Sequence, residues 1–187
     1  LSTGDPARLD PGIHFTRGDV NDRPKLWTLL QEVDCVYHLA ARVSVPESVI
    51  YPREYNAVNV GGTVNVLECC RTTESVRVVV NVTTDKCYEN REWPWGYREN
   101  EPMGGHDPYS SSKGAVELVV SAYRRSYFSR EQGAGSKEPV IRLASARAGN
   151  VIGGGDWAED RIVPDSARAL LRGQPIKVRN PRATRPW

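Results

Sequence analysis

Short apolar runs alternate along the chain with segments in which apolar residues recur every three or four positions. The runs, rich in β-branched residues, predict strands at residues 13–16, 35–41, 76–82, 140–148 and 175–178. The periodic segments predict helices from Pro24, over 56–71, from Tyr109 and over 165–172, where Gly173 ends the last one. The pattern therefore predicts regular alternation of strand and helix.

This alternation is typical of an α/β fold with a parallel sheet. Each strand–helix–strand unit brings the next strand back parallel to the first, with helices on both faces of the sheet. The mostly apolar run at 35–41 has the composition of a strand buried on both faces. We therefore expect a Rossmann-like, doubly wound parallel sheet. Its ligands should bind beyond the carboxyl ends of the strands, after Thr16, Leu39, Val82 and Arg147.

Composition narrows the classes of function that remain. A formal net charge of +2 over 187 residues gives no reason to expect a nucleic-acid partner or an anionic membrane surface. No apolar run reaches the length of a membrane span. The cysteines contain no C-x-x-C pair, so we expect no metal site, and reduced thiols indicate a cytoplasmic protein.

The ends of the chain and one long loop interrupt the pattern. The chain begins with Leu1, in a polar, turn-rich stretch, and it stops at Arg185-Pro186-Trp187 with no terminal helix or tail, so we expect a fragment. The segment 89–107 is irregular and holds tryptophans, prolines and glycines. Loops of this length in compact domains are often functional.

Tyr109 and Lys113 are the first candidates for chemistry. Residues four apart share one helix face, so the ammonium should lie beneath the phenol and lower its pKa toward the working range of a general base. The Y-x-x-x-K spacing arises by chance in many helices. Thr84, Asp85 and Lys86, directly after a predicted strand, strengthen the case, although an Asp in a turn is the plainer interpretation.

Further candidates have good structural explanations of their own. Asp19 follows Gly18 and suits either a turn or a contact with an adenine or ribose. Leu39, Ala40 and Ala41 suit either tight packing or a close ligand. Among the C-terminal polar residues, guanidinium groups suit a diphosphate and the amide suits a sugar; they are Asn150, Arg161 and Arg185.

Taken together, the motifs resemble the extended short-chain dehydrogenase/reductases, across nearly the whole chain. They occur in the order Gly18-Asp19-Val20, His38-Leu39-Ala40-Ala41, Asn59-Val-Gly-Gly-Thr63, Thr84-Asp85-Lys86, Tyr109-x-x-x-Lys113, Arg147-Ala-Gly-Asn150 and Arg185-Pro-Trp187. The segments 84–93, 95–99, 102–105, 107–109 and 147–157 more narrowly resemble the nucleotide-sugar 4,6-dehydratases that act on CDP-glucose.

The resemblance implies a lyase mechanism with NAD as cofactor. Tyr109, assisted by Lys113, would take the proton of the sugar 4-hydroxyl while NAD accepts the C4 hydride. Water would leave across C5 and C6, with Asp85 protonating the 6-hydroxyl, and the hydride would return to C6. Thr84 would hydrogen-bond the 4-oxygen. Many relatives carry Glu at the position of Lys86, so the role of this lysine stays open.

The resemblance also implies binding residues, domains and assembly. Asp19 and Val20 would flank the adenine, and Leu39, Ala40, Ala41 and Val58 would line NAD, beside Tyr109 and Lys113. Asn150, Arg161 and Arg185 would face the nucleotide sugar, so that residues 1–150 form a partial NAD-binding domain and 151–187 begin a substrate-binding region. The helices that begin at Asn56 and Tyr109 would pair in a homodimer.

One departure and several alternatives qualify this interpretation. The family's G-x-x-G-x-x-G loop, which holds the pyrophosphate, is absent, together with the first βαβ unit, so we expect this piece alone to bind NAD poorly. An epimerase would share Tyr109 and Lys113 but needs no acid for a 6-hydroxyl. A dehydratase for dTDP- or GDP-sugars, or a non-catalytic NAD-sensing scaffold, would also fit the fold.

Overall fold

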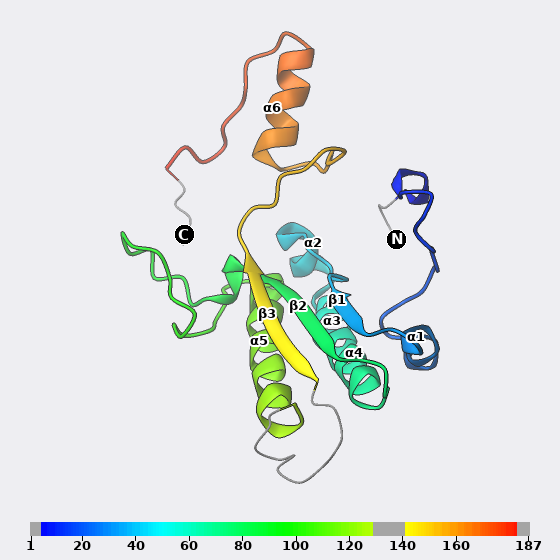
Figure 1. The fold of residues 1–187 in the computed structure, drawn as a ribbon. Coiled ribbons are helices and arrows are strands. Elements are labelled where there is room, and N and C mark those ends of the chain that lie inside the picture. Colours follow the sequence, from blue (N-terminus) through cyan, green and yellow to red (C-terminus); the bar gives the residue numbers. More distant parts are fainter. Residues whose placement is uncertain (1–4, 129–140, 183–187) are drawn as a thin grey trace.

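The protein is built on a parallel sheet with the strand order β1-β2-β3 (Figure 1). The computed structural model describes residues 5–128 and 141–182. The strands are β1 (Cys35–His38), β2 (Val78–Thr84) and β3 (Arg142–Ala148). The predicted parallel sheet is thus confirmed. Because the strands are parallel, their carboxyl ends lie at one edge of the sheet.

The predicted helices are also confirmed, with one of them divided. The structure has α1 (Arg23–Leu30), α2 (Val45–Ile50), α3 (Pro52–Asn56), α4 (Gly62–Arg71), α5 (Pro108–Ser126) and α6 (Ile162–Leu171). The helix expected over 56–71 passes from α3 through a π-helical turn, Ala57–Gly61, into α4. Such turns within helices are frequent at functional sites. Short 3₁₀ turns form at Pro6–Arg8 and Asp85–Cys87.

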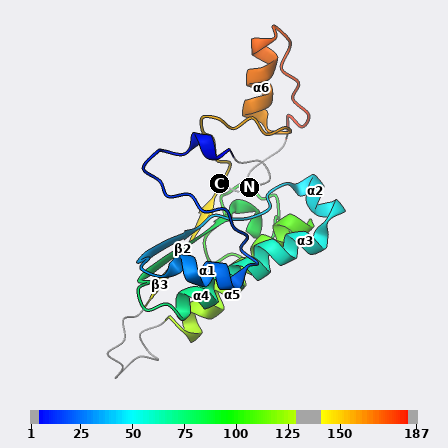
Figure 2. The same cartoon turned by 90° about the vertical axis from the view of Figure 1, so that its right-hand side faces the viewer.

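Helices cover one face of the sheet over the described residues (Figure 2). α5 packs on β2 and β3, and α1 packs on α4. The hydrophobic core between these elements includes Val66 and Leu67 of α4, Val79 of β2 and Val116 and Val120 of α5. Burying such aliphatic side chains contributes about 1.5–3 kcal/mol each.

The opposite face of the sheet is less covered than the apolar run at 35–41 predicted. Tyr37 in β1 is 66% exposed, and β2 alternates strictly between buried and half-buried residues. Burial of β1 on both faces was therefore a wrong prediction. The helices of the described chain pack on a single side, so alternate residues of each strand point away from them.

Two predicted strands do not form. Residues 13–16 and 175–178 form no regular element and are exposed, and no strand pairs with them in the part of the chain that the structure describes. A strand needs a neighbour for its backbone N–H and C=O groups, and β-propensity alone does not supply one. The predicted strand from 140 is observed as β3, although residue 140 itself lies outside the described ranges.

The start of α5 is set by a side-chain cap. Asp107 adopts extended backbone, and its carboxylate accepts a hydrogen bond from the Ser110 backbone N–H at 2.9 Å and from the Ser110 hydroxyl at 2.6 Å. Pro108 follows at the first helical position, where its missing N–H costs nothing. This cap fixes where the first turn of α5, with Tyr109, meets the sheet.

α6 stands apart from the sheet, beyond the carboxyl ends of the strands (Figure 1). Its apolar residues are largely exposed, with Ile162 at 60% and Leu171 at 78%. Gly173, at a φ of +62°, ends the helix as predicted. Over residues 5–128 and 141–182, no helix is long and apolar enough to cross a membrane.

Candidate active site

Most of the predicted catalytic residues lie together at the carboxyl edge of the sheet. Thr84 ends β2, Asp85 begins the 3₁₀ turn Asp85–Cys87, and this turn packs against α5. Tyr109 and Lys113 lie in the first turns of α5, and the Thr84 hydroxyl and the Asp85 carboxylate both influence the pKa of Tyr109. The structure therefore brings four of the predicted catalytic residues together.

Tyr109 and Lys113 are both buried, at 7% and 6% exposure. Burial raises the pKa of the Tyr109 phenol, against the lowering effects of the Thr84 hydroxyl and the Arg161 charge. The lowered pKa expected from the Tyr–Lys spacing is thus not found. Removing a phenolate from water costs more here than its neighbours recover. Burial likewise lowers the pKa of the Lys113 ammonium, which Glu117 raises in part.

Asp85 presents an unused oxygen to the site. Its Oδ1 accepts a hydrogen bond from the Thr84 hydroxyl at 2.9 Å, whereas Oδ2 is buried without a hydrogen-bond partner among the described residues. A buried unpaired carboxyl oxygen is costly unless a ligand or a proton satisfies it. Lys86, next in the chain, is half-buried, and its backbone N–H reaches the Thr84 hydroxyl at 3.4 Å.

Sequence reasoning missed the support behind α5. Asn59, in the π-helical turn, exchanges hydrogen bonds with the Arg42 backbone at 2.8 and 3.1 Å. Its Nδ2 also donates to Ser112 Oγ at 2.8 Å, and Ser112 donates to the Tyr109 carbonyl at 2.7 Å. This series of hydrogen bonds connects the loop after β1 to the backbone of Tyr109. Asn59 begins the motif Asn59-Val-Gly-Gly-Thr63, but the motif alone does not reveal the π-helical turn or the contact with α5.

Tyr55 of α3 is a second missed residue. It is fully buried, and its ring meets the Tyr109 ring edge-on at 6.4 Å between centroids. Its hydroxyl accepts from the Ser44 N–H at 3.0 Å and donates to Glu47 at 2.8 Å. Arg42 stacks over the same ring and pairs with Glu47 at 2.7 Å. Tyr55 is therefore held rigidly against Tyr109.

The residues predicted to line a cofactor divide into an open and a packed group. Leu39 is 66% exposed just beyond β1, with Ala40 exposed and Ala41 half-buried beside it. Val58 is half-buried in the π-helical turn, and Val20 packs beneath α4, where a Cβ on Gly62 would lie 2.5 Å from it. Asp19 is exposed in a turn and accepts from the Asn21 N–H at 2.8 Å.

The predicted substrate residues lie on the segment that follows β3. Asn150 is exposed two residues beyond the strand. Arg161 is exposed and pairs with Asp156 at 2.8 Å, yet its charge still reaches Tyr109. Arg185 lies outside the described residues. Two of the three residues are thus placed on the site side of the sheet.

The long segment after the 3₁₀ turn carries an aromatic cluster. Tyr97 stacks on Tyr88 with centroids 5.1 Å apart and packs on Trp93 at 5.2 Å, while Trp93 also stacks on Trp95 at 5.3 Å. Gly104 leads back to α5, since a Cβ on Gly114 would lie 2.7 Å from the Gly104 carbonyl oxygen. The loop is therefore folded against the catalytic helix.

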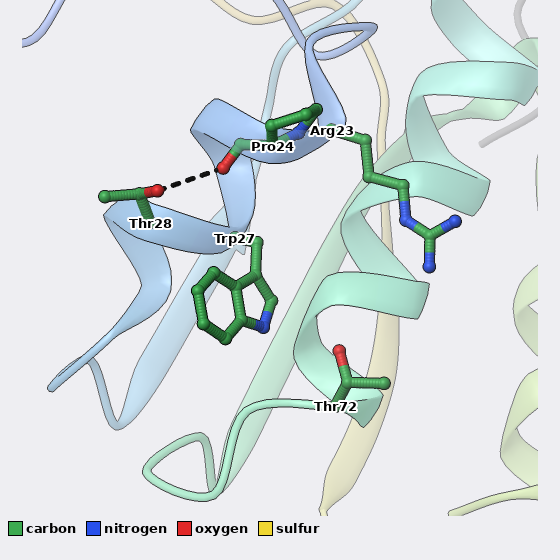
Figure 3. A pocket seen from close by; sticks show the side chains of 5 residues that line it. All are labelled: Arg23, Pro24, Trp27, Thr28 and Thr72. Atoms are coloured by element: carbon green, nitrogen blue, oxygen red, sulfur yellow. Dashed lines mark hydrogen bonds between the residues drawn. The ribbon is translucent and has the colours of Figure 1, made fainter.

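A separate depression lies between α1 and the end of α4 (Figure 3). It has a volume of about 440 Å³ and is lined by Arg23, Pro24, Trp27, Thr28 and Thr72. Thr28 donates to the Pro24 carbonyl within it at 3.1 Å. None of the predicted site residues lines this depression. Within the described ranges, no cluster of His, Cys, Asp and Glu side chains could hold a metal ion.

The family model and the relatives of similar sequence indicate the same family. The profile of the NAD dependent epimerase/dehydratase family matches residues 1–187. The chain is 51% identical over 183 residues to the CDP-glucose 4,6-dehydratase of Salmonella typhimurium strain LT2, covering 97% of this chain and 50% of that protein. It is 35% identical to the dTDP-glucose 4,6-dehydratase of Streptomyces antibioticus, covering 91% of this chain and 48% of the relative.

Solved structures share the fold. The UDP-glucose 4-epimerase of Thermus thermophilus, in complex with NAD, superposes with a TM-score of 0.78 and 31% identity over 94% of this chain and 54% of that one. The dTDP-glucose 4,6-dehydratase DesIV of Streptomyces venezuelae, with NAD bound, gives a TM-score of 0.74 and 28% identity over 90% and 48%. The Rossmann-like fold is confirmed, and the chain spans about half the length of these relatives.

Proposed function

The chain belongs to the NAD dependent epimerase/dehydratase family, and on that premise we propose that the full-length protein is a CDP-glucose 4,6-dehydratase. The observation that best supports a dehydratase is the buried carboxylate of Asp85 at the site. Its Oδ2 is buried and unpaired, its Oδ1 accepts from the Thr84 hydroxyl, and its charge raises the pKa of the Tyr109 phenol. An epimerase has no need for this additional acid.

The protein side chains would divide the proton transfers between them. Tyr109 takes the proton of the sugar 4-hydroxyl, and the Thr84 hydroxyl would turn from Asp85 Oδ1 to donate to the 4-oxygen. The adjacent 4-keto group acidifies the C5 proton, and Lys86, directly after Asp85 in the chain, would accept it as a free amine. Asp85 protonates the departing 6-hydroxyl, so water leaves across C5 and C6, and C5 takes a proton back when the hydride returns to C6. Lys113 assists Tyr109 by its positive charge.

The residues present fit NAD. Lys113 is buried and makes no hydrogen bond to another described residue, so its ammonium is available for the hydroxyls of a ribose. Leu39, Ala40 and Ala41 form an exposed to half-buried, apolar strand end directly after His38, whose pKa the Lys113 charge lowers. Asp19, Val20 and Val58 would complete the cradle. When bound, NAD supplies the acceptor for the C4 hydride and returns that hydride to C6.

The nucleotide and the assembly extend the proposal. Similarity to the Salmonella enzyme favours CDP-glucose as the substrate, with Asn150, Arg161 and Arg185 toward the nucleotide sugar. Residues 1–150 would serve NAD, and 151–187 would begin the substrate-binding region. Leu118, 63% exposed on α5, supports a homodimer that pairs the α3–α4 segment and α5 with their copies.

Product analysis tests this function. The full-length protein is incubated with CDP-glucose, dTDP-glucose and GDP-mannose, and the products are identified by mass and by the absorbance of 4-keto sugars in alkali. A 4-keto-6-deoxy sugar from CDP-glucose is expected. A product of unchanged mass with an inverted hydroxyl would indicate an epimerase instead. NAD binding without turnover of any sugar nucleotide would favour a sensing protein.

A further inference from the structure

Glu117 is a buried carboxylate one turn beyond Lys113 on α5. Its side chain is 5% exposed. Its Oε1 accepts from the Thr83 hydroxyl, and its Oε2 pairs with Arg147 Nη2 at 3.0 Å. Residues Tyr109, Lys113 and Glu117 are spaced by four, so they occupy one face of the helix. The Glu117 carboxylate thus follows Tyr109 and Lys113 on the same face of the helix, in the protein interior.

Arg147 connects Glu117 to the segment 88–99, here called the aromatic loop. From β3, where it pairs in register with Thr83, its Nη1 donates to the Tyr88 hydroxyl at 2.9 Å and to the Glu99 carbonyl at 2.8 Å. The guanidinium also lies over the Tyr88 ring, 5.1 Å from its centroid. One side chain therefore joins β3, α5 and both ends of the segment 88–99.

Glu117 is the charged neighbour of Lys113. The titratable groups that influence or sense Lys113 are Glu117, Cys87 and His38. Burial raises the pKa of the Cys87 thiol to about 12 and lowers the pKa of His38 to about 4. Both groups are therefore uncharged near pH 7, whereas the bonds from Arg147 and Thr83 lower the pKa of Glu117 against its burial.

We propose that Glu117 and Arg147 form a buried positioning pair for the active site, in which Glu117 supplies the counter-charge of Lys113 and Arg147 fixes Glu117 and the aromatic loop. In this role the pair would act through Lys113 and the aromatic loop, not by contact with substrate or cofactor. It rests on the proposed function only in that Lys113 assists Tyr109. An ion pair of this depth adds little stability by itself, but removing one partner leaves an uncompensated charge.

The pH dependence of the full-length enzyme tests the role of Glu117. Glu117→Gln removes the charge and keeps the shape, so Lys113 should lose its proton at lower pH and the alkaline limb of the kcat profile should move to lower pH. Glu117→Asp keeps the charge and should keep the limb in place. Glu68→Gln is the matched control, because Glu68 also pairs with an arginine, Arg71, and accepts from a hydroxyl, that of Tyr123. The control profile should not move.

Substitution of Arg147 tests the second half of the pair. Arg147→Met should lower kcat by about a hundredfold, the effect of a misplacement of about 1 Å at a reacting centre. Arg147→Lys keeps the charge but loses the planar guanidinium that donates to several partners at once. It should lower kcat less and leave the alkaline limb unmoved. An Arg147→Met enzyme with wild-type kcat and KM would overturn the role of Arg147.

A readout without turnover separates this proposal from the proposed function. The ¹³Cε resonance of Lys113 in lysine-labelled protein, assigned with Lys113→Arg, reports its protonation directly. We expect its titration midpoint to fall in Glu117→Gln and to stay in place in Glu68→Gln. An unchanged midpoint in Glu117→Gln would refute the counter-charge. If the protein turned over no sugar nucleotide, the proposed function would be refuted, but the titration midpoint would still test whether Glu117 is the counter-charge of Lys113.

Discussion

The ring of Tyr55 stands almost perpendicular to the ring of Tyr109, at 86° and with 6.4 Å between centroids. Edge-to-face contacts of this kind contribute about 0.5–1.5 kcal/mol and fix ring orientation. Tyr55 is itself anchored through its hydroxyl to Ser44 and Glu47. The orientation of the Tyr109 phenol, the proposed base, thus depends on a residue of another helix.

Substitutions at Tyr55 should separate packing from hydrogen bonding. Tyr55→Phe keeps the ring but leaves the Ser44 N–H without its partner, so we expect a loss of about 1–3 kcal/mol in the free energy of unfolding with little change in kcat. Tyr55→Leu removes the edge contact and should lower kcat about tenfold as well. Urea unfolding and steady-state kinetics on the full-length protein measure both. Equal kcat values for the two variants would contradict the orienting role.

Asp85 should be indispensable for loss of water. Asp85→Asn cannot donate the proton to the 6-hydroxyl, so kcat should fall by about 10²–10⁴-fold, the usual contribution of a general acid. NAD affinity, measured by calorimetric titration, should not change. The control is Asp34→Asn, at an exposed carboxylate before β1. Wild-type turnover by Asp85→Asn would remove Asp85 from the mechanism.

His38 makes stability depend on pH. Burial and the charge of Lys113 lower its folded pKa to about 4, below the value near 6.5 in an unfolded chain. The unfolded state therefore binds more protons between these values, and the stability present above about pH 6.5 is lost as the pH falls toward 4. The loss is on the order of 3 kcal/mol at about 1.4 kcal/mol per pKa unit.

The control for this prediction is an exposed histidine. His38→Gln should remove part of the difference in unfolding free energy between pH 7 and pH 4.5, whereas His14→Gln, at an exposed position, should not. Urea denaturation at the two pH values gives the comparison. An identical pH dependence in wild type and His38→Gln would show that this imidazole is not held neutral by the fold.

The thiols should differ in reactivity. Burial raises the pKa of Cys70 and of Cys87 to about 12, and only the thiolate is a strong nucleophile. Cys35 is half-buried and less protected. Brief treatment of the native protein with iodoacetamide at pH 8, followed by peptide mass spectrometry, should therefore label Cys35 first. Early labelling of Cys87 would mean that the turn Asp85–Cys87 opens readily.

The sequence predicted the parts of the fold that depend on local pattern. The helices at Pro24 and Tyr109 and the strands around Val79 and Leu143 follow from periodicity. Thr84 and Tyr109 meet because the helix that follows a strand of a parallel sheet begins near the carboxyl end of that strand. The failures have tertiary causes. The strands at 13–16 and 175–178 lack neighbours, and the pKa of Tyr109 rises because packing removes water, which a spacing of four residues does not reveal.

The missed residues share the same cause. Glu117 extends the Tyr109–Lys113 spacing by one more turn, which is a signal in the sequence, but its importance depends on Arg147 from a distant strand. Tyr55 gains its role only when α3 packs against α5. Contacts between elements far apart in the chain carry no periodic signal.

Hydride migration within the sugar tests the central claim most directly. The full-length protein is incubated with CDP-glucose deuterated at C4, and the position of the deuterium in the product is determined by NMR and mass spectrometry. We predict a CDP-4-keto-6-deoxyglucose that carries the deuterium at C6. Deuterium retained at C4 of a product that still has its 6-hydroxyl would contradict the dehydratase and establish an epimerase in its place.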